Sequence, residues 1–374
     1  MKIVQVTHHF SPCIGGVESV VLETSRRLVE AGHEVSVVCL DRCAKGGKIL
    51  PGTGEIDGIK ITRIPFIDLK YYKIAPRVLS LITGADLVHV HGVGFFSDYL
   101  LALKGVHKLP VIVSTHGGIM HTRKMRAIKA IYGLWMPLML NRADAVVAVS
   151  KNDRDAFSRI CAGGKVRLIE NGIDYARFAN ARGKTEKNSF IYVGRLSRNK
   201  RVDNLIETFA FLKKAGVEFK LTILGHDFDG IAEKLHGLVE KKGLGGDVMF
   251  VGSAEAEELA KAVARAEYFV SASEYEGFGL STVEAMAAGT VPLVNNIPAF
   301  RQLIHNRRNG FLLDYGKPEL AARVIQEVIG MPAVERVRIA GRAKSRAKSF
   351  DWERKVREFE GLYSQVVQRL KCKK

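Results

Sequence analysis

Glu276, Glu284 and a glycine-rich loop lie together in the stretch SASEYEGFGLSTVEAMAAG, residues 271–289. The apolar, aromatic run from Tyr268 to Ala272 predicts a buried strand, and an alanine-rich helix is expected to begin near Leu280. A glycine loop that opens a helix presents free backbone N–H groups and the positive end of the helix dipole, which suits an anion such as a phosphate. The stretch therefore predicts an anion site with carboxylates beside it.

The carboxylates of Glu276 and Glu284 are expected to frame this site at different depths. Glu276 precedes the predicted helix, and Glu284 lies in its first turns. A carboxylate accepts two hydrogen bonds from vicinal hydroxyls, so both residues are suited to binding a sugar or a ribose. For Glu284 a structural alternative stays open, because Ser281-x-x-Glu284 also has the spacing of a capping box.

A basic segment begins at the end of a second predicted strand, FIYVGRL, and leads into a helix expected from about 202 to 214. It contains Arg195, Arg198, Lys200 and Arg201. Cations are unfavourable at a helix start, so their crowding favours a dianion bound among them, with a solvated basic loop as the alternative. Together with the glycine loop at 277–279, the basic loop predicts a phosphate-binding centre.

The first half of the chain has its own candidate residues after predicted strands. Gly15 and Gly16 end the loop HHFSPCIGG, which lacks the G-x-G-x-x-G spacing of a dinucleotide site and so disfavours NAD. They allow close backbone approach at a helix start, or form only a flexible loop. His116 follows another strand, in STHGG, where ligands of parallel sheets gather. We expect His116 to be functional rather than a structural or solvated loop residue.

The chain of 374 residues has 47% hydrophobic residues, which is enough for two or three ordinary domains. Short apolar runs alternate with helical patterns on both sides of residues 179–189, which are polar, aperiodic and predicted to be a linker. The amino end is already strand-like, without the features of a signal peptide, and no apolar run is long enough to span a bilayer. A cytoplasmic location is therefore expected.

The net charge of +18 indicates an anionic partner, which a nucleic acid, an anionic membrane or a phosphorylated substrate would each satisfy. The five scattered cysteines predict reduced thiols without a disulfide framework. Asp227 and Asp229 have a spacing that can hold Mg²⁺, but the same spacing recurs at Asp153 and Asp155 and is interpreted as incidental. No metal site is predicted.

A basic segment runs into an apolar, aromatic one within residues 121–140, HTRKMRAIKAIYGLWMPLML. Arginines and lysines at 123–129 precede Trp135 and its apolar neighbours. One interpretation is a helix that packs on its own domain, and the other is a surface that docks on anionic lipid.

Over nearly its whole length the sequence resembles the retaining glycosyltransferases of the GT-B fold often called family four. The segments that carry the resemblance are GGVES (15–19), STHGG (114–118), ENGID (170–174), GRLSRNKRVDNLI (194–206), EGFGLSTVEAMAAG (276–289), NGFLL (309–313) and FDWERKVREFEGLY (350–363). The stretch with the paired glutamates is the most specific of them. The sequence departs from the family at His226, where a second glycine is usual, and residues 121–140 match no shared motif.

The resemblance implies an α/β protein with two Rossmann-like domains that face each other across a deep cleft. The expected domains are an acceptor-binding domain over 1–172, a nucleotide-sugar-binding domain over 173–350, and a last helix over 351–374 that crosses back to the first domain. The implied reaction is retaining transfer of a hexose-type sugar from a UDP- or GDP-sugar to a hydroxyl of a lipid-linked or glycan acceptor.

The resemblance also implies a role for each candidate residue. His116 and Glu276 would contact the donor sugar, and Arg195 and Lys200 would neutralise the diphosphate. The remaining contacts to the donor phosphates and ribose are expected from Gly15, Gly16, Gly277, Phe278, Gly279, Leu280 and Glu284. Neither a metal nor a cofactor is expected, because the family's front-face course needs none.

Two other function classes are alternatives to the transferase. A basic protein that binds membranes or nucleic acid would explain the charge but not the two glycine loops, and no aromatic stacking platform for bases is evident. A nucleotide-sugar isomerase of related architecture would convert the donor without an acceptor. We therefore expect a nucleotide-sugar and a glycan or lipid acceptor as partners, and no nucleic acid. An anionic membrane surface is a partner only under the lipid-docking interpretation of residues 121–140.

Overall fold

A computed structural model describes residues 1–13, 15–43, 47–69, 72–116, 126–183 and 185–372, with the backbone alone for residues 126–131. The chain divides into two compact units. Unit 1 comprises residues 1–172 and 352–374, and unit 2 comprises residues 173–351. Each unit is described by itself.

Unit 1 is built on an eight-stranded sheet with the order β10-β9-β8-β7-β1-β2-β4-β3. Its strand pairs are parallel except β3 with β4. Runs of Val, Ile and Leu predicted these strands apart from β3, and such runs are typical of a sheet covered on both faces. The strands are β1 (Lys2–Thr7), β2 (Glu34–Leu40), β3 (Thr53–Ile56), β4 (Ile59–Ile64), β7 (Leu87–His91), β8 (Val111–Ser114), β9 (Ala145–Ala148) and β10 (Val166–Leu168).

The helices of unit 1 include the last helix of the chain. Helix α15 (Trp352–Lys371) packs against α1 (Gly16–Glu30), and Glu360 accepts a hydrogen bond from His33 at 3.0 Å. The predicted return of the last helix to the first domain is thereby confirmed. The other helices of at least eight residues are α3 (Phe95–Ala102), α5 (Arg126–Leu140) and α6 (Lys151–Ser158).

Unit 2 has a six-stranded sheet with the order β13-β12-β11-β14-β15-β16, and all its strand pairs are parallel. The first strand, β11, lies in the middle of the sheet, with β12 and β13 added on one side of it and β14, β15 and β16 on the other. This is the strand order of a Rossmann fold. The strand order therefore reverses between β11 and β14. The strands are β11 (Glu186–Val193), β12 (Lys220–Leu224), β13 (Val248–Val251), β14 (Ala266–Ser271), β15 (Val291–Asn295) and β16 (Phe311–Leu313).

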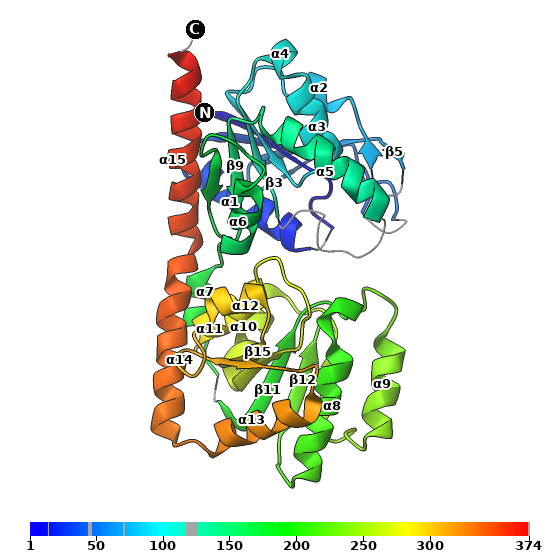
Figure 1. Ribbon diagram of the computed structural model, residues 1–374, viewed down its shortest axis with the longest axis vertical. Coiled ribbons are helices and arrows are strands. Elements are labelled where there is room, and N and C mark those ends of the chain that lie inside the picture. The colour runs from blue at the N-terminus through cyan, green and yellow to red at the C-terminus, as the bar shows by residue number, and fades with distance from the viewer. Residues whose placement is uncertain (14, 44–46, 70–71, 117–125, 184, 373–374) are drawn as a thin grey trace. The chain divides into compact units, whose positions relative to one another are not determined.

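Helices cover both faces of the unit 2 sheet (Figure 1). Phe190 and Tyr192 of β11 pack with α8 (Val202–Lys214), α9 (Ala232–Lys241) and α13 (Pro318–Gly330), and Ile191 points to the opposite face. That face is covered by α10 (Ala256–Arg265), α11 (Leu280–Ala288) and α14 (Ala333–Ala347). The alternation follows from the two-residue period of a strand.

The predicted linker at residues 179–189 is wrong. The unit boundary falls at Gly172 and Ile173, and α7 (Tyr175–Ala179) and β11 both belong to unit 2. The start of β11 is exposed at Glu186 and Lys187, so its residues are polar and lack the apolar pattern from which a buried strand is predicted.

The expectation that all cysteines are reduced is also wrong. Cys13 and Cys43 form a disulfide with their Cα atoms 5.5 Å apart. Cys13 follows β1 and Cys43 follows β2, so two neighbouring parallel strands bring them to one edge of the sheet. Their separation of 30 residues hides this closeness in the sequence. Cys39, Cys161 and Cys372 are free thiols.

Candidate active site

The candidate site of unit 2 is built on the two loops that leave β11 and β14. These strands flank the point where the sheet reverses its order, and their carboxyl ends are where ligands bind in such folds. One loop carries the short 3₁₀ helix Arg198–Lys200, and the other carries Glu276. Lys200 Nζ lies 2.6 Å from Glu276 Oε1, and both side chains are only 14% exposed.

Hydrogen bonds from hydroxyl and amide groups position Glu276 and the residues just before it. Ser273 Oγ donates to Glu276 Oε1 at 2.8 Å, and Ser271 Oγ lies 3.1 Å from Ser273 Oγ. Asn295 of β15 donates to the Ser273 carbonyl oxygen at 3.0 Å. The carboxylate therefore has a fixed position before any ligand is present.

Asn199 ties the two loops together. Its carbonyl oxygen accepts from the Glu274 amide at 2.9 Å, and its side chain donates to the Tyr275 carbonyl oxygen at 3.3 Å. Ser197 Oγ donates to Asn199 Oδ1 at 2.8 Å and orients that side chain. Sequence reasoning missed Asn199 and Ser273, and their only signal was that both are polar residues inside the loops already singled out.

Arg195 lies in the same region of unit 2. Its guanidinium carbon is 4.4 Å from the centre of the Phe228 ring, and its carbonyl oxygen accepts from the Tyr192 hydroxyl at 3.0 Å. Burial, followed by the negative charge of Glu276, raises the pKa of Tyr192, whereas the charge of Arg195 opposes the rise. The charges of Glu276 and Arg195 therefore both act on the Tyr192 hydroxyl.

Two of the four cations of the basic loop have carboxylate partners within the protein. Lys200 pairs with Glu276, and Arg201 pairs with both Asp203 and Glu274. Carboxylates of the protein therefore neutralise these cations. An incoming phosphate would compete with Glu276 for Lys200, or share that ammonium group with it.

The glycine loop turns sharply into α11, as predicted. Gly279 has φ +101°, and a Cβ there would come within 2.9 Å of the Phe300 ring, so the position needs glycine. The amides that begin α11 have no acceptor within their own helix. Phe278 is buried, with its ring 5.4 Å from that of Phe350, so its side chain belongs to the core and only its backbone faces the loop.

Glu284 is not a helix cap. Helix α11 begins at Leu280, its N-cap is Gly279, and no side chain caps it, so the capping-box alternative is wrong. Burial raises the pKa of Glu284 to about 7, and the charge of Arg177 opposes the rise. Among the described residues, Glu284 shares no hydrogen bond or ion pair with Lys200 or Glu276.

Asp227 and Asp229 have structural partners. The carboxylate of Asp227 accepts from the amides of Ile231 and Ala232 at 2.9 and 3.0 Å, and these backbone hydrogen bonds lower its pKa. Asp229 accepts from the Arg198 amide at 2.9 Å. Searched over the described residues, the chain has no cluster of three or more His, Cys, Asp or Glu side chains suited to a metal.

In unit 1, half-buried His116 joins a chain of hydrogen-bonded polar groups. It follows β8 with a left-handed φ of +46°, and its Nε2 lies 3.0 Å from Nδ1 of His91. His91 Nε2 lies 2.7 Å from Gln5 Oε1. Burial lowers the pKa of His116 to about 4 and that of His91 well below its usual value, so both rings are neutral at pH 7.

These contacts define the tautomer of His116. When His91 donates from Nε2 to the amide oxygen of Gln5, its Nδ1 must accept a hydrogen bond. His116 then donates from Nε2, which leaves its Nδ1 as an acceptor. A second set of hydrogen bonds joins His89 Nδ1 to the hydroxyl of Tyr363 of α15 at 2.7 Å and His89 Nε2 to Ser114 Oγ at 2.8 Å.

Gly15 and Gly16 open helix α1, as predicted. A Cβ on Gly16 would meet nothing within 4 Å, so the backbone there is open to close approach. A Cβ on Gly15 would instead collide with the carboxylate of Glu18. This acidic side chain occupies the helix start and must move aside if an anion binds there.

Of the segment 121–140, residues 121–125 lie outside the described residues. Helix α5 packs on unit 1 through Met136, Met139 and Leu140, which are buried. Leu134, Trp135 and Leu138 are exposed, at 78%, 46% and 63%. The helix therefore has both a packed face and an exposed apolar face. None of the described helices is long and apolar enough to cross a membrane.

Two family profiles match the chain. Glycosyltransferase Family 4 matches residues 14–177, and Glycosyl transferases group 1 matches residues 176–346. A GDP-mannose:cellobiosyl-diphosphopolyprenol alpha-mannosyltransferase from Xanthomonas oryzae is 37% identical over 333 residues, which are 87% of each chain. This chain belongs to glycosyltransferase family 4. A protein of the same name from Komagataeibacter xylinus is 32% identical to this family 4 chain and covers 99% of it, with 94% of its own length aligned.

Solved structures agree on the fold of this glycosyltransferase. Sucrose-phosphate synthase from Thermosynechococcus elongatus has a TM-score of 0.80 at 22% identity, with 98% of this chain and 99% of that chain covered. Anabaena HepE, solved in complex with UDP and glucose, has a TM-score of 0.77 at 18% identity, with 98% and 100% covered. The GT-B fold expected from the resemblance is confirmed.

Proposed function

We propose that this glycosyltransferase transfers a mannosyl residue from GDP-mannose to a hydroxyl of a lipid-linked diphospho-oligosaccharide, with retention at the anomeric carbon. The donor and the acceptor class are those in the names of the two mannosyltransferases that are 37% and 32% identical to this chain. The alpha linkage in those names fits a retaining reaction of a donor that is itself an alpha-linked sugar nucleotide.

The pair of Lys200 and Glu276 is the observation that carries the proposal. It joins a cation for the diphosphate to an acceptor for sugar hydroxyls, at 2.6 Å, where the two central loops of a Rossmann-type sheet meet. Ser273 donates a hydrogen bond to Glu276, and Asn199 joins the two loops that carry the pair. These hydrogen bonds position both groups before the donor binds. Preorganised charge of this kind lowers the barrier of a reaction whose leaving group becomes more negative.

In the proposed reaction, the bond from the anomeric carbon of mannose to the β-phosphate oxygen breaks. The acceptor hydroxyl oxygen forms the new bond on the same face, and its proton passes to the departing phosphate oxygen. Arg195, Lys200 and the backbone amides from Gly277 to Leu280, which lead into α11, would stabilise the charge on the nucleoside diphosphate.

The other contacts follow from the chemistry of each group. Nδ1 of His116, an acceptor, would take a hydrogen bond from a donor-sugar hydroxyl, and the carboxylate of Glu284 would accept from the ribose diol. Gly16 would let backbone approach the donor phosphates. The reaction is proposed to run without a metal, which the engagement of Asp227 and Asp229 with backbone amides supports.

We further propose that the exposed apolar residues of α5, Leu134, Trp135 and Leu138, dock on an anionic membrane where a lipid-linked acceptor would lie. The alternatives of a nucleotide-sugar isomerase and of a binding protein without catalysis are not favoured, because the relatives are named as transferases.

Acceptor-dependent release of nucleoside diphosphate from a panel of UDP-, GDP- and ADP-sugars tests the proposal. We expect GDP-mannose with a lipid-linked diphospho-oligosaccharide to give turnover, and hydrolysis without acceptor to be much slower. Conversion of the donor into another nucleotide-sugar, without acceptor and without release of nucleoside diphosphate, would instead support the isomerase.

A further inference from the structure

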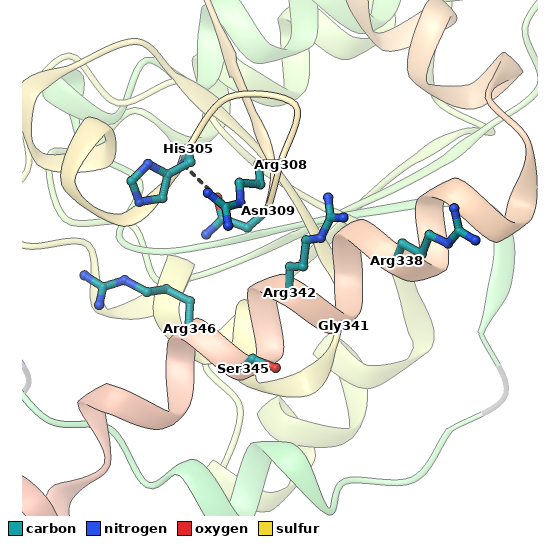
Figure 2. Close-up of a pocket in the computed structure, with 8 residues that line it drawn as sticks. All are labelled: His305, Arg308, Asn309, Arg338, Gly341, Arg342, Ser345 and Arg346. Carbon is teal, nitrogen blue, oxygen red and sulfur yellow. Dashed lines mark hydrogen bonds between the residues drawn. The ribbon is translucent and has the colours of Figure 1, made fainter.

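Four arginines gather at a cavity of about 610 Å³ in unit 2 (Figure 2). Arg338, Arg342 and Arg346 come from helix α14, and Arg308 comes from the loop between α12 (Pro298–Leu303) and β16. We call this cavity the arginine pocket. No acidic residue lines it.

The arginine pocket lies apart from the loops of the candidate active site. Residues 304–310 lead into the start of β16, so they lie at the amino edge of the parallel sheet. The loops that carry Lys200 and Glu276 leave the opposite, carboxyl edge. The donor phosphates therefore do not account for these arginines.

The spacing along α14 places the pocket residues on one face of the helix. Arg338, Arg342 and Arg346 follow at intervals of four, and Gly341 and Ser345 lie between them on the same side. Ile339, Ala343 and Ala347 are buried on the side of the core. A Cβ on Gly341 would meet nothing within 4 Å, so the floor of the pocket is open.

These arginines lack the acidic partners that neighbouring arginines have. Within the described ranges, no carboxylate pairs with Arg308 or with any of the three arginines of α14. By contrast, Arg307, the residue before Arg308, pairs with Glu327 at 3.1 Å, and Arg323 pairs with Glu319 at 2.7 Å. Like charges four residues apart destabilise a helix, so α14 bears this arrangement at a cost that a bound anion would remove.

The helix dipole explains only part of the cluster. A cation in the last turn of α14, such as Arg346, is favoured by the negative end of the dipole. Arg338 lies in the middle of the helix and Arg308 lies outside it, so neither gains from that effect. Nε of Arg346 is buried without a hydrogen-bond partner, although its Nη1 donates to Ser349 at 3.2 Å.

The loop side of the pocket is held in shape before any ligand binds. The side chain of Asn309, which is buried, accepts from the His305 amide at 2.7 Å and donates to the Leu303 carbonyl oxygen at 3.0 Å. Figure 2 shows the first of these bonds beside the side chains of Arg308 and His305. Arg308 on the loop and Arg342 on α14 lie on either side of the pocket, and Arg338 and Arg346 extend towards its two ends. Planar guanidinium groups match the oxygens of a phosphate, which they bind in pairs of hydrogen bonds.

We propose that the arginine pocket is a second anion-binding site, and that it takes a phosphate or diphosphate group. The group can belong to a free phosphate ester or to a lipid headgroup, which present the same oxygens. The site goes beyond the transferase function proposed above and does not depend on it.

Calorimetric titration with inorganic pyrophosphate tests this site. The background is Lys200→Ala, which lacks the principal cation of the donor site, so binding there does not mask the pocket. In that background we compare Arg338→Gln/Arg342→Gln with the matched control Arg307→Asn/Arg323→Gln, which removes the same charge from arginines that have acidic partners. We expect the first pair of substitutions to weaken pyrophosphate binding by about tenfold or more, because charge-assisted hydrogen bonds are lost. The control should bind like its background.

Equal affinities in the pocket variant and its background, or an equal loss in the control, would overturn the site. The single variant Arg308→Gln, on the loop rather than on α14, should also weaken binding, which guards against a change confined to the helix. Competition by vesicles distinguishes the two sources of the phosphate. Displacement of pyrophosphate by phosphatidylglycerol vesicles, but not by phosphatidylcholine vesicles, assigns a headgroup, and no displacement by either assigns a free phosphate ester.

Discussion

At the scale of single residues, the site rests on ionisable groups whose partners set their charge. Lys200 and Glu276 form a close ion pair with little exposure. Glu284 is half-buried, and its pKa is raised to about 7. His116 is neutral at pH 7 because burial lowers its pKa to about 4.

Removing either member of the Lys200 and Glu276 pair should abolish most of the transfer. We expect Lys200→Ala and Glu276→Ala each to lower kcat by about 100-fold or more, on the scale of removing one preorganised charge stabiliser. Steady-state kinetics checks this. The surface variant Arg323→Gln, whose pair with Glu319 is exposed, should retain full activity.

Glu284 should give donor binding a pH dependence near 7. Its carboxylate form accepts from ribose hydroxyls, so affinity for GDP should rise as the pH rises through about 7. Calorimetry over this range should show the rise in the wild type and in His116→Gln, and no rise in Glu284→Gln. A rise that persists in Glu284→Gln would assign it to another group.

The same group affects stability in the opposite sense. Because the pKa in the folded state is above the value of 4.5 for a free side chain, folding favours the protonated form. The stability that Glu284 contributes is therefore full below pH 4.5 and is lost as the pH rises through about 7. Glu284→Gln should be more stable than the wild type above pH 7 in thermal unfolding, and the advantage should shrink towards pH 4.5.

At the scale of elements, sequence patterns predicted the strands and the order of the helices better than the loops between them. Apolar runs identify buried strands, and the glycine at 279 is required by its conformation and by Phe300. The hydrogen bonds of Asn199 and the disulfide of Cys13 with Cys43 join segments distant in the chain. No local pattern encodes such contacts, so they could not be predicted from the sequence.

The disulfide gives a direct chemical prediction. In unfolded protein prepared without reductant, thiol titration should find three free thiols, those of Cys39, Cys161 and Cys372, and five after reduction. Cys13→Ser should leave Cys43 as an additional free thiol. Five thiols before reduction would show that the bond does not form.

The exposed apolar face of α5 predicts binding to anionic membranes. Leu134→Ser/Leu138→Ser should reduce flotation with phosphatidylglycerol vesicles, because these side chains are 78% and 63% exposed and would insert among the lipids. The control Val334→Ser/Val337→Ser changes two side chains of α14 with 60% and 70% exposure and should float like the wild type. An equal loss in both variants would contradict a role specific to α5.

At the scale of the whole molecule, the resemblance seen in the sequence anticipated both Rossmann-like units and the return of the last helix. The reversal of strand order between β11 and β14 explains why the basic loop and the glutamate loop meet, although 76 residues separate Lys200 from Glu276. The same topology could be expected from two successive α/β patterns. The pairing of Lys200 with Glu276 could not, because periodicity does not fix the direction of a loop side chain.

The measurement that tests the account most directly is the transfer assay with GDP-mannose and a lipid-linked diphospho-oligosaccharide, read as GDP released and as the anomeric configuration of the product. The account predicts acceptor-dependent release, an alpha-linked mannosyl product, and loss of both in Lys200→Ala and Glu276→Ala that still fold. Full turnover by those two variants, or a beta-linked product, would contradict it.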